Sequence, residues 1–131
     1  MWITKPVVAD GSNAMALTQI DHVSEDEEMQ ECIDSCLECA QACEWCADEC
    51  ADEGEEMAEC LRLCRDVADL VSLHARFMAR NSGYSSDVAA ITADACEECA
   101  DECEQHDAEH CQVCADVLRD CAETCRNMAS A

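Results

Sequence analysis

Residues 32–50 read CIDSCLECAQACEWCADEC and place six cysteines in nineteen residues, separated by alternating steps of four and three. This alternation keeps the six side chains on one face of an α-helix, because the helix turns once in about 3.6 residues. The same alternation is typical of the seam along which helices pack at a shallow angle. The stretch therefore predicts a helix whose buried face is lined with thiols.

Three later segments repeat the alternation, and they begin at Met57, at Ala89 and at Cys111. The segments are rich in helix-forming residues, and breaks fall at Gly54, at 81–86 and at 105–110. We expect helices over 25–52, 55–80, 86–105 and 108–129, with Ser24 and Ser86 as N-terminal caps, and a short helix over about 14–22. Four helices with short connections and one stripe each predict an all-α, antiparallel up-down-up-down four-helix bundle with a cysteine-lined core.

The chain of 131 residues is long enough for one domain, which we expect over 15–131. Residues 1–14 end in SNA before Met15, which is typical of the remnant of a cleaved expression tag, or of a flexible N-terminal segment. The chain has only two Trp, one Tyr and one Phe, so an ordinary aromatic core cannot be built. Another kind of side chain must line the interior.

Acidic residues number 31 against seven Lys and Arg, which gives a net charge of −24. This balance excludes nucleic acid as a partner, because binding to phosphates needs Lys and Arg. The acids are typical of a solvated coat like that of proteins from halophilic, high-salt cytoplasms. The sequence shows no membrane span and no secretory signal, so we expect a cytoplasmic protein without a membrane partner.

Fifteen cysteines in a chain of this kind indicate metal binding, because a reducing cytoplasm disfavours disulfides. Thiols at steps of three or four lie about 5–6 Å apart on a helix, and such pairs suit Cu(I) best. Two alternatives to Cu(I) binding remain: the sequestration of zinc or another d10 ion, and a structural or redox bundle based on disulfides or thiols. The cysteine spacing that is typical of iron–sulfur clusters is absent. No catalytic constellation is present, and we expect no enzyme. The candidate metal ligands are Cys32, Cys36, Cys39, Cys43, Cys46, Cys50, Cys60, Cys64, Cys96, Cys99, Cys103, Cys111, Cys114, Cys121 and Cys125.

The stretches CIDSCLECAQACEWCADEC and CEECADECEQHDAEHCQVCADVLRDCAETCRNM, with CLRLCRDVADLVSLHARFMARNS between them, resemble the cytosolic branch of the bacterial copper storage proteins. The resemblance covers residues 29–128. It implies a four-helix bundle whose thiolates bind multiple Cu(I) ions, assembled as a homotetramer. It also implies that one or both of His106 and His110, in the CEQHDAEHC stretch, are metal ligands, while the alternative is that they accept hydrogen bonds from turn amides.

The chain departs from the family pattern at Val67, Val71 and Leu118, where the family often has cysteine. Folding the helices antiparallel places Val67 and Leu118 in one middle layer with Cys39 and Cys99. We expect this layer to thin the metal chain, with a denser thiol group at the Gly54 end. At the other end, thioethers could form an entry port that passes copper from solvent to the thiolates, and the residues of this port would be Met29, His74, Met78 and Met128. The sequence leaves open whether His74 is a metal ligand or a core residue. We expect His22 on the surface.

Overall fold

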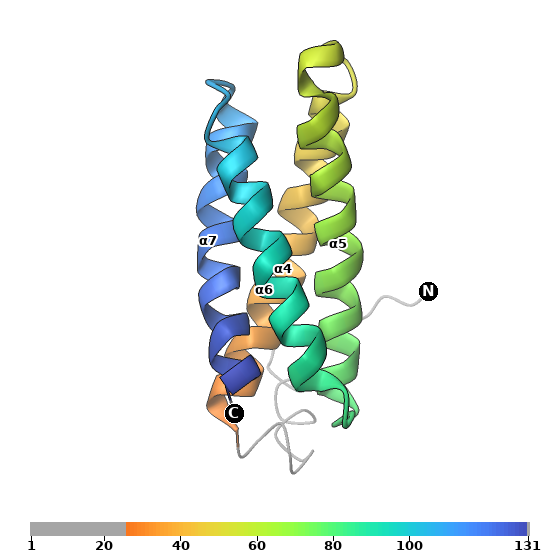
Figure 1. Ribbon diagram of the computed structural model, residues 1–131, viewed down its shortest axis with the longest axis vertical. Helices are drawn as coiled ribbons and strands as arrows, with labels where there is room; N and C mark the ends of the chain where they lie inside the picture. Colours follow the sequence, from red (N-terminus) through yellow and green to blue (C-terminus); the bar gives the residue numbers. More distant parts are fainter. Residues whose placement is uncertain (1–25, 131) are drawn as a thin grey trace, which may run out of the picture.

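The computed structural model describes residues 26–130, which form an antiparallel bundle of four long helices (Figure 1). Helix α4 spans Glu27–Cys50, η1 is a 3₁₀ helix over Glu55–Met57, α5 spans Ala58–Ala79, α6 spans Ser85–Cys103 and α7 spans Glu109–Ser130. Each helix packs against the next along the chain, and α7 packs against α4, so the path closes around one interior. The predicted all-α four-helix bundle is confirmed. The expected helix over 14–22, Met15 and His22 lie outside the described residues.

The ends of the four long helices lie close to the expected positions, but the two predicted caps are wrong. Asp26 caps α4, because its carboxylate accepts a hydrogen bond from the Met29 backbone N–H at 2.9 Å. Ser24 therefore lies too early in the chain to satisfy the first turn. Helix α6 begins at Ser85 without a side-chain cap, which places Ser86 inside the helix.

Two connections close one end of the bundle, at the top in Figure 1. They are residues 51–57, between α4 and α5, and residues 104–108, between α6 and α7. Gly54 has a φ of 95°, which other residues rarely adopt, and no atom lies within 4 Å of a Cβ built there. The backbone conformation, rather than a lack of space, is thus the reason for glycine. We call this the turn end, and the opposite end, where α4 begins and α7 ends, the terminal end.

Two arginines of α7 form exposed ion pairs that hold α6 in register. Each guanidinium donates to two carboxylates at 2.6–2.9 Å: Arg126 to Asp94 and Glu97 of α6, and Arg119 to Asp101 of α6 and to Glu104, which directly follows this helix. Since the two sets stand seven residues apart on both helices, they repeat with the period of the seam. The register of the ion pairs therefore agrees with that of the buried side chains.

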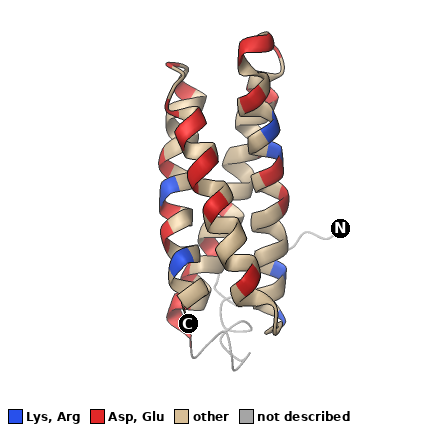
Figure 2. Ribbon diagram, viewed as in Figure 1, with Lys and Arg blue, Asp and Glu red and all other residues tan. Residues whose placement is uncertain are grey.

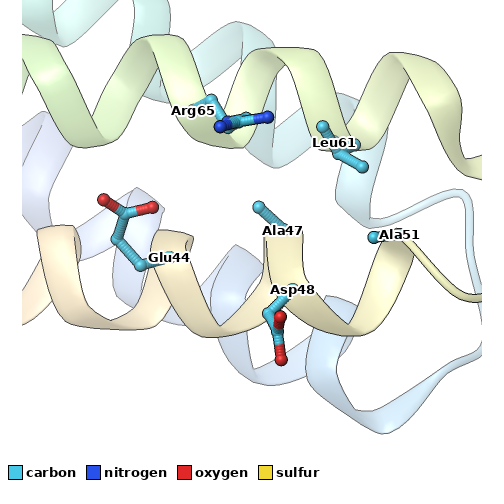
Figure 3. A pocket seen from close by; sticks show the side chains of 6 residues that line it. All are labelled: Glu44, Ala47, Asp48, Ala51, Leu61 and Arg65. Atoms are coloured by element: carbon cyan, nitrogen blue, oxygen red, sulfur yellow. The ribbon is translucent and has the colours of Figure 1, made fainter.

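The outer faces of the bundle are strongly acidic, with carboxylates on all four helices and few cations (Figure 2). Among the described residues, no helix is long and apolar enough to cross a membrane. A surface groove between α4 and α5 is lined by six residues, Glu44, Ala47, Asp48, Ala51, Leu61 and Arg65 (Figure 3). The groove contains no sulfur atom and no imidazole, so it offers no ligand to a soft metal ion.

Candidate metal centre

All fifteen cysteines point into the bundle. Each has at most 1% of its surface exposed, and each carries a free thiol. Their burial follows from the seam spacing, because every step of three or four residues returns the side chain to the inner face. The thiols occupy positions where leucine normally packs, and they form the main lining of the core.

Nine cysteines form a dense cluster at the turn end. The shortest sulfur contacts in it are Cys60–Cys103 at 3.5 Å and Cys64–Cys99 at 3.7 Å, both between α5 and α6. The cluster contains two groups of four sulfurs, and within each group all sulfurs lie within 4.8 Å of one another. Both groups include Cys46. We call these nine residues the turn-end cluster: Cys43, Cys46, Cys50, Cys60, Cys64, Cys99, Cys103, Cys111 and Cys114.

Six cysteines and one histidine form a sparser cluster at the terminal end. Cys125 lies at its centre, with its sulfur 3.9 Å from those of Cys32 and Cys36. The Nδ1 atom of His74 lies 3.5 Å from Cys125 Sγ and 3.6 Å from Cys36 Sγ. The terminal-end cluster consists of Cys32, Cys36, Cys39, Cys96, Cys121, Cys125 and His74.

One sulfur contact within 4.0 Å joins the two clusters. It runs along α4, from Cys39 Sγ to Cys43 Sγ at 3.9 Å. On α7, the register in which Cys96 meets Cys121 and Cys103 meets Cys114 places the buried Leu118 opposite Cys99. The middle layer is therefore apolar on α5 and α7, where Val67 and Leu118 are buried, as expected from the sequence. Whether metal occupancy thins there stays a prediction.

His110 joins the turn-end thiols to a surface carboxylate. Its Nδ1 lies 3.3 Å from Cys46 Sγ and 3.6 Å from Cys111 Sγ, while its Nε2 lies 2.9 Å from Glu53 Oε1. A carboxylate on the outer nitrogen orients the ring and makes the inner nitrogen a better ligand. Glu53 was not predicted, because a chain with so many acids gives no signal for one of them.

The two remaining histidines of the described chain have different surroundings. The Nε2 atom of His106 lies 2.9 Å from Glu102 Oε2 on the preceding turn, and His106 belongs to none of the candidate ligand groups. His74 is fully buried, and its Nδ1 faces the sulfurs of Cys36 and Cys125, so its position is compatible with a ligand. In the sequence, a single histidine on the buried face of a helix carries no signal that distinguishes a metal ligand from a core residue.

The crowded thiols shift the pKa values of one another. Burial raises the pKa of Cys111 to about 11. The pKa of Cys64 is lowered, first because the Cys103 thiol donates a hydrogen bond to it, and the pKa of Cys36 is raised, first through its hydrogen bond with Cys121. Some thiols thus hold their protons tightly while neighbours lose theirs readily. Because a metal ion must displace the remaining protons, its affinity falls as the pH falls.

A bundle with thiols and imidazole nitrogens inside defines a protein that binds soft metal ions. The family model described as "Copper storage protein" matches residues 25–130, and the chain belongs to this family.

Three relatives illustrate the similarity. The Cu(I)-bound copper storage protein BsCsp3 is 38% identical, covers 78% of this chain and 98% of its own, and superposes with a TM-score of 0.74. A cytosolic copper storage protein from Streptomyces lividans, in a structure with five coppers, is 37% identical, with coverage of 80% and 94% and a TM-score of 0.76. The cysteine-rich protein YhjQ of Bacillus subtilis is 37% identical over 103 residues, which are 77% of this chain and 95% of that protein.

Proposed function

We propose that this protein stores copper as multiple Cu(I) ions, held by the thiolates of its fifteen cysteines with His110 as a further ligand. One observation carries the proposal: the fifteen buried sulfurs form a continuous network, in which each lies within 4.8 Å of another from one end of the bundle to the other. Thiolates select soft ions such as Cu(I), and burial protects them from water. The storage role assigned by the family name agrees with this arrangement and requires no catalysis.

Copper uptake at the turn end follows from the surface around His110. A hollow there is lined by Glu53, Glu56, Met57, His106, Asp107 and Ala108, and Glu53 itself contacts His110. Carboxylates attract the cation, and the imidazole leads to Cys46 and Cys111. His106 is then part of the mouth rather than a ligand of the buried ions. The alternative port at the terminal end stays a prediction, since Met29, Met78 and Met128 are at most 9% exposed.

An anaerobic titration tests the storage proposal. Reduced protein competes for Cu(I) with a coloured chelator, and bound copper is counted per chain. We expect several ions per chain, at most about one per thiol, all bound more tightly than by the chelator. Binding of no more than one ion, or weak Cu(I) binding beside uniformly tight Zn²⁺ binding, would overturn the proposal.

We further propose that the protein is cytoplasmic and assembles as a homotetramer. The support is its resemblance to the cytosolic branch of the family, together with the Streptomyces lividans relative described as cytosolic. Light scattering on the purified protein measures the mass of the assembly. A mass equal to one chain at micromolar concentration would contradict the tetramer.

A further inference from the structure

The group formed by Cys32, Cys36, His74 and Cys125 differs from every other candidate ligand group in the described chain. It is the one set of four buried donors that includes an imidazole, and its members belong to no other group. The two four-thiol groups of the turn end share Cys46, so they can bind metal only as one connected cluster. Cys121 borders the group with His74, with its sulfur 3.9 Å from that of Cys36 and 4.0 Å from that of Cys125, but the four donors of the group can surround one ion without a ligand from another group.

The spacing of its donors fits a single tetrahedral ion. Bond lengths of about 2.3 Å to sulfur and about 2.0 Å to nitrogen require edges of about 3.8 Å between sulfurs and about 3.5 Å between sulfur and nitrogen. Four edges of the group are 3.9, 3.9, 3.6 and 3.5 Å, and the other two are within 4.8 Å. Three thiolates and one imidazole around a tetrahedral ion are the donor set of structural zinc sites.

The charge of the site also favours a divalent ion. Three thiolates and a neutral imidazole carry a charge of about −3, so a dication leaves about −1, whereas one Cu(I) leaves about −2. All four donors are fully buried, where uncompensated charge is costly. In the turn-end groups, a fourth thiolate in place of the imidazole would leave a dication with more uncompensated charge.

His74 is also a costly residue to bury without a metal ion. Its Nε2 has no hydrogen-bond partner among the described residues, and its Nδ1 faces two sulfurs alone. A neutral imidazole with its proton on Nε2 would present the Nδ1 lone pair to an ion between those sulfurs. A bond from Nδ1 to the ion would compensate for the burial of the ring.

We propose that these four residues form a separate tetrahedral site for a divalent ion of the Zn²⁺ type, which ties α4, α5 and α7 together at the terminal end. Three of its ligands belong to the fifteen cysteines of the storage proposal, so copper loading would follow or displace the divalent ion there, but the site does not depend on that proposal. Because a structural zinc site contributes directly to folding, an ion here stabilises the bundle before any copper is loaded.

Cobalt(II) is the spectroscopic probe for the test. Reduced, metal-free protein is titrated anaerobically with Co²⁺, and Zn²⁺ is then added. We expect intense visible bands of tetrahedral Co²⁺ with thiolate ligands, saturating in a first step at one ion per chain and lost on addition of Zn²⁺. One equivalent of Zn²⁺ should also raise the thermal unfolding temperature.

Matched variants locate the site. His74→Ala should shift the visible bands, weaken Co²⁺ binding at least tenfold and abolish the stabilisation by Zn²⁺. His74→Cys should restore tight tetrahedral binding with altered charge-transfer bands. Val71→Ala, which removes a buried side chain one turn away, and Cys64→Ser, which removes a donor from the turn end, should leave the first step unchanged.

Two results would overturn the site: pale octahedral Co²⁺ spectra in the wild type, or identical spectra and affinities in the wild type and His74→Ala. Cu(I) titration of the same samples separates this failure from failure of the storage proposal. Normal multi-copper loading with no tetrahedral Co²⁺ step would reject only the divalent site.

Discussion

Replacing Leu118 by cysteine should add a copper ligand to the apolar middle layer. Leu118 is fully buried, and the register of α6 and α7 places it opposite Cys99. In Leu118→Cys, the new sulfur would give the two clusters a second connection beside Cys39 and Cys43. We predict that the capacity of the protein rises by about one Cu(I) per chain, since Cu(I) needs only two or three sulfurs.

The same change should destabilise the metal-free protein. Leucine carries three carbons beyond Cβ and cysteine one sulfur, so about two methylene equivalents are lost, at about 0.8 kcal/mol each. With the cost of the cavity, we expect a loss of about 2–3 kcal/mol in the free energy of unfolding. The control Leu118→Ala loses three carbons and should cost about 3–5 kcal/mol. Since domains have a total stability of about 5–15 kcal/mol, Leu118→Cys should remain folded, and circular dichroism before the titration checks that Leu118→Ala does so as well.

Two measurements decide the prediction: urea unfolding of the reduced, metal-free variants, and anaerobic Cu(I) titration against a chelator. Only Leu118→Cys should gain copper, although both variants lose stability. Equal copper in the wild type and both variants would show that the apolar layer does not limit occupancy. Extra copper in Leu118→Ala would show that space, rather than the number of thiols, sets the capacity.

Three further predictions concern the turn end and the surface. Glu53→Gln removes the carboxylate behind His110 and should weaken the copper site containing it by about 10- to 100-fold in chelator competition, and an unchanged affinity would contradict the proposed role. The reduced, metal-free protein should lose stability as the pH rises from about 9 to 11, because folded Cys111, whose pKa is raised to about 11, keeps a proton that the unfolded chain releases. Urea unfolding at several pH values measures this, and a rise in stability over that range would refute it. The thermal unfolding temperature of the metal-free protein should increase with added salt, because screening weakens the repulsion within a net charge of −24, and an unchanged temperature in a salt series would count against it.

The fold could be predicted almost completely from the sequence. Steps of three and four residues specify one buried face on each helix, so the inward direction of all fifteen cysteines follows from local geometry. The helix ends were less predictable, because capping depends on which side chain reaches the first turn. Asp26 reaches it, although Ser24 is an equally good cap by residue type and stands before the same acidic turn.

The candidate site could be predicted only as a set of residues. The sequence indicated which thiols face inward, and its interruptions at Val67 and Leu118 indicated an apolar middle layer. It did not indicate which donors converge, because convergence depends on the register and rotation of helices that are distant in sequence. His106 and His110 look equivalent in CEQHDAEHC, yet His110 faces two thiols and His106 faces Glu102.

The sequence by itself therefore determined the helices, their buried seams and the soft-metal chemistry of the interior, because all three depend on residue type and on spacing within one helix. Only the tertiary structure decided how the fifteen thiols divide into nine at the turn end and six at the terminal end, with one link through Cys39 and Cys43. It also decided that His74 completes a four-donor group and that Glu53 supports His110. Those contacts join three helices in one case and a loop to a helix in the other, and only packing brings such residues together.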